Sequence, residues 1–210
     1  MEIPELVVPD ATAWRAWLND HHSKSPGVWL VLAKKGTQTP TNLSYDEALD
    51  DAICFGWIDG QLGRRDDVTF RRRFTPRGPR SPWSKRNVGI AERLLLAGLM
   101  HNSGEREVER AQSDGRWEAA YAGQASAEVP DDLAQALAAD PAALSLFQTL
   151  NGANRYAILY RVETAKKEET RTRRIAELVD MLARGETIHP QGSPKRLRGE
   201  SGNEAGRQQQ

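Results

Sequence analysis

The sequence has little cysteine, little histidine and no net charge. It contains one cysteine, Cys54, and four histidines among 210 residues. A single thiol cannot form an internal disulfide, and these few scattered ligands are a poor set for a metal site, so we expect neither a metal nor another cofactor. Lys and Arg total 29, as do Asp and Glu, so the formal charge is zero. This balance excludes a global attraction to nucleic acid or to an anionic membrane.

Long apolar segments are also lacking. No apolar run approaches the roughly 18 residues that a membrane-spanning helix needs. The first residues, Met1 to Glu5, do not show the basic and apolar regions of a secretory signal peptide. We therefore expect a cytoplasmic protein without a membrane span. With 39% hydrophobic and 28% charged residues, the composition is that of a globular protein.

Composition divides the chain into two parts and a tail. All six tryptophans precede residue 120, whereas residues 126–185 are rich in Ala and Leu. From Pro190 onward, Gly, Ser, Gln and charged residues replace the apolar residues that could offset the entropy of ordering. We predict a Trp- and Arg-rich α+β domain over residues 1–125, a helical module over residues 130–188 and a disordered tail over residues 189–210.

The N-terminal part combines helix and strand signals. Asp10 is a good N-cap for a first helix, and Ser44 to Glu47 form a capping box that begins a helix ending at Phe55. β-Branched and aromatic residues predict strands, with a turn near Asp66, over residues 28–35, 57–62 and 68–75. Two further helices are expected over residues 84–97 and 103–114. The fold class is therefore α+β, with a small, mainly antiparallel sheet of about three strands packed with helices.

The C-terminal part is predicted to be helical. Asp140 and Pro141 are an N-cap followed by proline in the first turn, and Asn154 is expected to cap the next helix. The apolar pattern then fades across residues 166–172, so residues 154–184 form either one helix or two. Pairs such as Glu169 with Arg173 favour the single helix.

The strongest anomaly is a basic segment. Residues 64–86 contain nine basic and two acidic residues, a local charge of +7. In a strand, Arg71 and Arg73 share one face about 7 Å apart, opposite Phe70 and Phe74. Guanidinium groups bind phosphate or carboxylate through paired hydrogen bonds, and an indole offers a stacking surface. The candidate ligand-binding residues are Trp57, Arg71, Arg73, Arg77, Arg80, Trp83, Lys85 and Arg86.

The alternative is a solvated surface whose arginines pair internally with the carboxylates at positions 46, 47, 50, 51 and 59. Exposed ion pairs contribute only about 0 to 1 kcal/mol each, so a gain in stability explains poorly why this segment contains so many arginines. Asp59 is also the one candidate catalytic base, although a structural role in orienting an arginine explains it as well. Cys54, at a helix C-terminus, is interpreted as a buried structural thiol.

A second group of candidates lies in the helical part. If a helix begins near Thr170, the charges of Arg171 and Arg174 oppose the positive end of the helix dipole. An anion or a carboxylate should then compensate them. Thr170, Arg171 and Arg174 are therefore secondary candidates for anion binding.

Three separated motifs resemble those of one bacterial family. They are Cys54-Phe-Gly-Trp-Ile-Asp-Gly60, Arg73-Phe-Thr-Pro-Arg-Gly-Pro-Arg-Ser-Pro-Trp-Ser-Lys-Arg-Asn87 and Ala165-Lys-Lys-Glu-Glu-Thr-Arg-Thr-Arg-Arg-Ile175. In this order they resemble the YdeI/OmpD-associated (OmdA, bacteriocin-protection) family, over roughly residues 6–185. The resemblance implies a small helical module from about residue 130 and a role in envelope stress or protection from antimicrobial peptides. It supplies no catalytic residues.

The leading interpretation is a non-catalytic cytoplasmic protein of the stress or bacteriocin-protection class. It would bind an anionic small molecule or an acidic protein surface through the Arg-rich strand and loop. One alternative is an enzyme acting on a phosphorylated or carboxylated small molecule, with Asp59 as base and the arginines stabilising negative charge. The other is a nucleic-acid-binding protein, which steep salt dependence would reveal.

Overall fold

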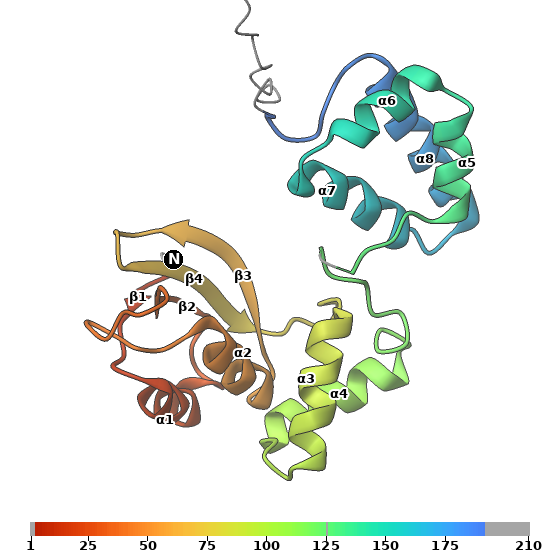
Figure 1. The fold of residues 1–210 in the computed structure, drawn as a ribbon. Helices are drawn as coiled ribbons and strands as arrows, with labels where there is room; N and C mark the ends of the chain where they lie inside the picture. The colour runs from red at the N-terminus through yellow and green to blue at the C-terminus, as the bar shows by residue number, and fades with distance from the viewer. Residues whose placement is uncertain (1–2, 125, 192–210) are drawn as a thin grey trace, which may run out of the picture. The chain divides into compact units, whose positions relative to one another are not determined.

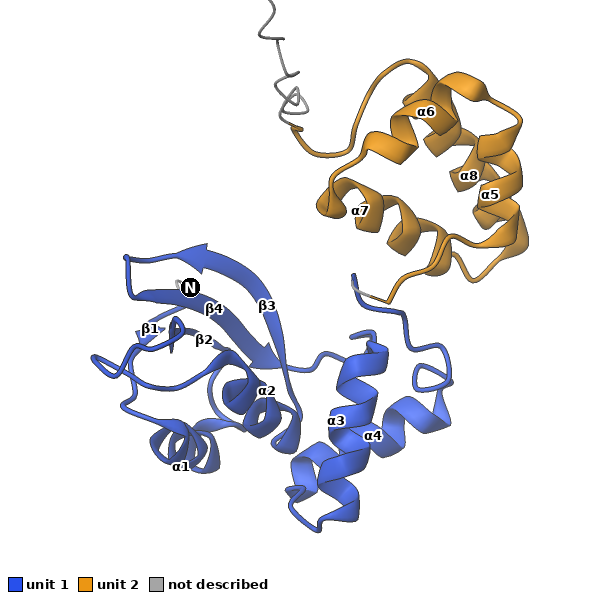
Figure 2. Ribbon diagram, viewed as in Figure 1, with its two compact units in different colours: residues 1–125 blue, residues 126–210 orange. Residues whose placement is uncertain are grey.

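The computed structural model describes residues 3–124 and 126–191, and these form two compact units. The first unit spans residues 1–125 and the second residues 126–210, each with its own hydrophobic core (Figure 2). The α+β class predicted from the sequence is confirmed, with a helical C-terminal region.

The sheet of the first unit has four strands, one more than expected. They are β1 (Glu5–Leu6), β2 (Val28–Ala33), β3 (Trp57–Arg64) and β4 (Thr69–Pro76), in the order β1-β2-β4-β3. Strand β1 pairs parallel to β2, and the remaining pairs are antiparallel. Two residues are too few to show an alternating pattern, so β1 could not be predicted from the sequence.

Four helices complete this unit. They are α1 (Ala11–His21), α2 (Tyr45–Cys54), α3 (Lys85–Leu96) and α4 (Asn102–Ser113). Helices α1 and α2 cover one face of the sheet (Figure 1). Trp14 of α1 packs there against Trp57 and Phe74, with ring centroids 6.4 and 5.7 Å apart. Phe74 of β4 is fully buried in this core, as the predicted alternation of that strand requires.

The helix caps follow the local sequence. Ser44 accepts a hydrogen bond from the Glu47 amide, and Glu47 accepts one from the Ser44 amide, which confirms the capping box. Asp10 caps α1 in the expected way. His101 caps α4 through its ring nitrogen, and the helix begins at Asn102, one position before the expected start at residue 103.

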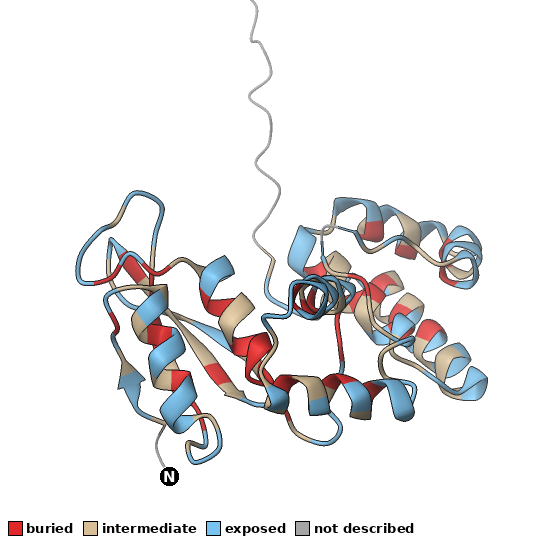
Figure 3. Ribbon diagram, turned by 90° about the horizontal axis from the view of Figure 1, so that it is seen from below, coloured by how far each residue is buried: buried red, intermediate tan, exposed pale blue. Residues whose placement is uncertain are grey.

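The described part of the second unit, residues 126–191, contains four helices. They are α5 (Asp131–Ala138), α6 (Pro141–Thr149), α7 (Gly152–Glu163) and α8 (Glu168–Ala183). Their buried faces meet around Leu133, Leu137, Phe147 and Val162, and Figure 3 shows the alternation of buried and exposed residues along each helix.

The preference for one helix over residues 154–184 was wrong. Helix α7 ends at Glu163 and α8 begins at Glu168, so the polar residues between them form a connection. The expected ion pair of Glu169 with Arg173 is replaced by Arg173 with Glu177, at 3.8 Å. The cap of α7 is Asn151, whose side chain accepts from the amide of Asn154, and not Asn154 itself.

Residues 189–191, assigned from the sequence to the tail, are hydrogen-bonded to the second unit. The Asn154 side chain accepts from the His189 amide and donates to the His189 carbonyl oxygen, at 2.8 and 3.1 Å. The Gln191 side chain accepts from the Asn151 amide and donates to the Thr149 carbonyl oxygen. The rest of the predicted tail, residues 192–210, lies outside the described residues. Within the described part of the chain, none of the helices has the length and apolarity required to cross a bilayer.

Candidate anion-binding site

Two of the candidate arginines lie on the sheet face opposite α1 and α2. Arg71 and Arg73 project there from β4, and Trp29 of β2 is the cross-strand partner of Arg73. The Arg71 guanidinium lies 5.0 Å from the centroid of the Trp29 ring, and one of its nitrogens is 3.4 Å from the Glu5 carboxylate. Arg73 forms no ion pair with any described residue. Of these two arginines, Arg71 is therefore partly neutralised, by a carboxylate that it shares with Arg65, and Arg73 is not.

Arg72 and Asp59 occupy the opposite face. Asp59 accepts a hydrogen bond from the Tyr45 hydroxyl at 2.8 Å and pairs with Arg72 at 2.9 Å. The guanidinium groups of Arg72 and Arg86 lie 4.5 and 5.1 Å from the centroid of the Tyr45 ring. Burial, with the neighbouring Asp59 charge, raises the pKa of Tyr45 to about 12. Asp59 thus orients an arginine and a tyrosine, and this arrangement supports its structural role over that of a base.

The carboxylates of α2 pair with arginines, as the internal-pairing alternative proposed, although several partners come from outside the basic segment. Arg86 pairs with Asp46 at 2.6 Å. Arg93 of α3 and Arg15 of α1 pair with Asp50 and Asp51, each at 2.7 Å. Arg86 is therefore paired with a carboxylate in the folded protein and is not an uncompensated cation.

Arg77 is in a different environment from the strand arginines, because it is buried. Its exposed fraction is 5%, and its guanidinium carbon lies 3.6 Å from the centroid of the Trp83 ring. One nitrogen, Nη1, donates to the Pro82 carbonyl oxygen at 3.2 Å. No described residue accepts a hydrogen bond from Nε or Nη2. Burial lowers the pKa of Arg77 to about 10, and the charge of Glu107 only partly opposes this shift.

Two arginines from α4 and the segment after it contact the same loop. Arg110 donates to the Gly78 carbonyl oxygen at 3.4 Å and pairs with Glu107. Arg116 donates to the Ser81 carbonyl oxygen at 2.9 Å and binds Asp114 through Nε. Arg110 Nε and Arg116 Nη2 are also buried without an acceptor among the described residues. We call Arg77, Arg110 and Arg116 the loop arginine cluster.

The loop arginine cluster has the chemistry of an oxyanion site. Three guanidinium groups contact one short loop, residues 78–82, whereas Glu107 and Asp114 supply two of the opposite charges. Four guanidinium nitrogens and Trp83 Nε1 are buried without a partner in the described structure. A buried donor left without an acceptor costs about 1 to 3 kcal/mol, and a native protein normally satisfies such groups with water or a ligand. Phosphate, sulfate or carboxylate oxygens supply matching acceptors.

Sequence reasoning missed Arg110 and Arg116. Both lie outside the basic segment and near acidic residues, in the pattern of an ordinary exposed helix. Only the path of the chain brings them to the loop after β4. No local signal marked them.

The remaining candidate residues lie elsewhere. The Trp57 ring is buried in the core and donates through Nε1 to the His22 carbonyl oxygen, so its faces are not open to a ligand. Arg80 and Lys85 are exposed. In the second unit, Arg171 of α8 pairs with Asp132 at 2.6 Å and Thr170 lies in the first turn of that helix. Arg174 lines a groove between α7 and α8. The basic segment is therefore not one continuous site.

The described residues contain no group of three or more His, Cys, Asp or Glu side chains that could hold a metal ion. His22 and His101 do approach each other, with ring centroids 4.9 Å apart beside Phe55. Burial lowers the pKa of His101, and the charge of His22 adds to this shift. This pair packs against aromatic and aliphatic groups and does not face a carboxylate cluster.

Comparison with known families divides the chain in the same place as the structure. Residues 6–107 match the model of a domain of unknown function, DUF8412. Residues 126–185 match the model of the bacteriocin-protection, YdeI or OmpD-associated (OmdA) family. The family resemblance inferred from the sequence is thus confirmed for the second unit, while two of its three motifs lie in the region that matches DUF8412. Comparisons with curated proteins and with solved structures gave no match.

Proposed function

We propose that this protein binds an anionic ligand at the loop arginine cluster. The observation that carries the proposal is Arg77, which is 5% exposed and keeps two nitrogens, Nε and Nη2, without an acceptor among the described residues. The guanidinium carbon lies over the Trp83 ring, and a bidentate oxyanion at Nε and Nη2 would supply the acceptors that these two nitrogens lack. Arg110 and Arg116 add one such donor each.

The buried arginine has an energetic consequence in the absence of a ligand. An unpaired buried charge opposes folding, and a bound anion relieves this cost. We therefore expect Arg77→Met to leave the ligand-free protein as stable as the wild type or more stable, because Met still covers Trp83 without the charge. A purely structural arginine would behave in the opposite way, since its removal would lower the unfolding midpoint.

Binding is tested by thermal denaturation and calorimetry with phosphate, sulfate and a nucleoside monophosphate. Wild type is expected to gain stability as the anion concentration rises. Arg77→Met should lose that gain, with affinity about tenfold to a hundredfold lower, because charged hydrogen bonds contribute about 1.5 to 3 kcal/mol. Arg80→Met is the matched control, since Arg80 is an exposed arginine of the same loop. Equal loss in both variants would contradict a specific site.

Salt dependence separates a small anion from a nucleic acid. Several backbone phosphates bound together give a steep fall in affinity with salt concentration, whereas one oxyanion gives a shallow one. We expect the shallow dependence, because the proposed site uses only the unpaired donors around one short loop and not the unpaired Nε atoms of Arg71, Arg72 and Arg73 along β4. A nucleic-acid-binding protein would instead bind through the sheet face that carries Arg71 and Arg73. The double variant Arg71→Ala/Arg73→Ala should then lose binding, whereas binding of a small anion at the loop arginine cluster should be unaffected.

We further propose a role in the bacteriocin-protection class and a cytoplasmic location. The match of residues 126–185 to the bacteriocin-protection family model supports this role. Replacing the wild-type gene with one encoding Arg77→Met and measuring survival under antimicrobial peptides tests the role. Fractionation of the same cells tests the location. Full survival of the variant strain would show that protection does not depend on anion binding at Arg77.

A further inference from the structure

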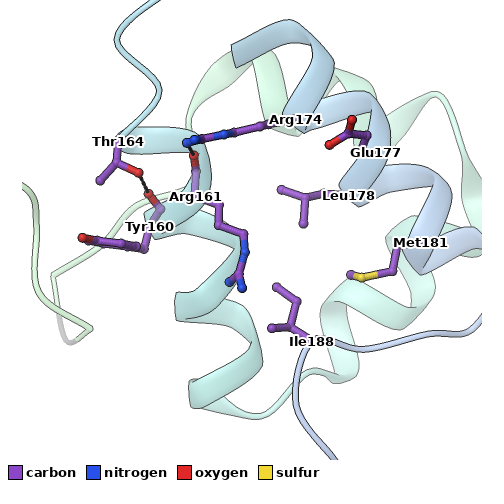
Figure 4. A pocket seen from close by; sticks show the side chains of 8 residues that line it. All are labelled: Tyr160, Arg161, Thr164, Arg174, Glu177, Leu178, Met181 and Ile188. Carbon is purple, nitrogen blue, oxygen red and sulfur yellow. Dashed lines mark hydrogen bonds between the residues drawn. The ribbon is translucent and has the colours of Figure 1, made fainter. Parts of the chain in front are cut away.

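The second unit contains a groove that the proposed anion site does not involve. It encloses about 700 Å³ and lies between α7, α8 and the segment that follows α8. Figure 4 shows Leu178 and Met181 of α8 directed toward the same space as Ile188 and Arg161. A volume of this size is within the range of about 300 to 1,000 Å³ typical of small-molecule sites.

The groove has two cations without a carboxylate partner. Arg161 donates one N–H to the Ala157 carbonyl oxygen at 2.9 Å, and Arg174 donates one to the Arg161 carbonyl oxygen at 2.7 Å. Neither guanidinium forms a salt bridge with a described residue. Glu177, the acidic residue lining the groove, is 3.8 Å from Arg173 outside it. Backbone contacts thus hold both arginines while their remaining donors stay available.

The other wall is apolar. Leu178 is 7% exposed, and Met181 and Ile188 are partly buried against the core of the unit. Met adapts its shape to varied apolar partners because its side chain is unbranched and flexible. The groove therefore presents cations at one side and flexible apolar surface at the other.

We infer that this groove binds a small amphipathic monoanion. Its carboxylate would lie against Arg161 and Arg174, and its hydrocarbon part against Leu178, Met181 and Ile188. The charge complementarity of two unpaired guanidinium groups selects the anionic head, and the apolar wall selects a chain over a compact anion such as phosphate. The inference is independent of the loop arginine cluster, because it concerns residues of the other unit.

The experiment uses the full-length protein with decanoate as probe and decanol as its uncharged counterpart. Methyl resonances of Leu178, Met181 and Ile188 should shift on titration with decanoate, and decanol should bind at least about tenfold more weakly. Arg161→Gln and Arg174→Gln should each weaken decanoate binding about tenfold. Lys166→Gln is the control, since it removes an exposed positive charge of the same unit that does not line the groove, and it should leave binding unchanged.

Three results would overturn the inference. They are equal affinity for decanol and decanoate, an equal loss in Lys166→Gln, and methyl shifts that occur only outside the groove. Because Gln keeps most of the side-chain length, the variants should retain the wild-type thermal midpoint. If one of them unfolds, the double variant Leu178→Met/Met181→Leu alters the apolar wall at constant charge, and unchanged decanoate binding in it would also overturn the inference.

Discussion

The guanidinium group of Arg77 lies over the indole of Trp83, with its central carbon 3.6 Å from the centroid of the ring. This contact replaces water on one face of a buried cation. It does not satisfy the N–H groups, which point outward in the guanidinium plane. Nε and Nη2 therefore stay buried without an acceptor among the described residues, which is the deficit that a bound anion would remove.

The capping box gives a first prediction. Ser44→Ala should lower the stability of the first unit by about 0.5 to 2 kcal/mol, because it leaves the Glu47 amide without its acceptor. Ser44→Thr keeps the hydroxyl and should retain most of the stability. Urea denaturation measures both, and an unchanged midpoint for Ser44→Ala would contradict the role of the cap.

The turn between β3 and β4 predicts a pH-dependent stability. The Thr69 hydroxyl and the amides of Thr69 and Val68 donate to Asp66, and they lower the pKa of its carboxyl group to about 2. The unfolded value is about 3.9, so this stabilisation is present above pH 4 and is lost as the pH falls through about 2. Asp66→Asn should lower the urea midpoint at pH 7, with the difference from wild type shrinking between pH 4 and pH 2.

Asp67→Asn is the control for that turn. The Asp67 side chain makes no hydrogen bond with the described residues, so its replacement should leave the midpoint at pH 7 unchanged. A difference between Asp66→Asn and wild type that stayed constant down to pH 2 would show that the carboxylate does not act through its charge.

Two helical glycines should respond in opposite directions to replacement by alanine. A Cβ on Gly104 of α4 would overlap the Cys54 carbonyl oxygen at the end of α2. Gly104→Ala should therefore destabilise the protein by about 1 to 3 kcal/mol. A Cβ on Gly89 of α3 would meet nothing within 4 Å, and Gly89→Ala should stabilise by about 0.5 to 1 kcal/mol. Thermal denaturation of both variants tests the pair, and a neutral Gly104→Ala would show that the helices can separate freely.

Cys54 should be chemically inert in the native state. Its side chain is fully buried, and its sulfur lies 2.9 Å from the Leu99 carbonyl oxygen. A bulky disulfide reagent should label the native protein slowly and the urea-unfolded protein fast. Cys54→Ser should cost less than about 1 kcal/mol, because a hydroxyl can donate to the same oxygen. Rapid labelling of native protein would instead indicate an accessible, reactive thiol.

Adjacent arginines of β4 should differ in their effect on stability. Arg72→Met removes the partner of Asp59, whose side chain is only 14% exposed, and should cost about 1 to 3 kcal/mol. Arg73→Met removes a side chain without an ion pair among the described residues and should change stability by less than about 0.5 kcal/mol. The denaturation midpoints of both variants measure this difference. If the two variants lose the same amount of stability, the ion pair of Arg72 with Asp59 contributes nothing.

Local features of this protein could be predicted from its sequence. The caps at Asp10 and Ser44 and the alternation of Arg71 and Arg73 with Phe70 and Phe74 follow from interactions within a few residues. The two-residue strand β1 and the break between α7 and α8 did not follow, because tertiary pairing and packing determine both.

The candidate anion-binding site depends on tertiary structure even more than the fold does. The positive charge of residues 64–86 and the short separation of Arg77 from Trp83 along the chain can be read from the sequence. The pairing of Arg72 and Arg86 with carboxylates, the burial of Arg77 and the contacts of Arg110 and Arg116 with its loop follow from the folded structure alone. A charged side chain loses water only when the chain folds, and contacts between residues far apart in sequence determine which side chains do so.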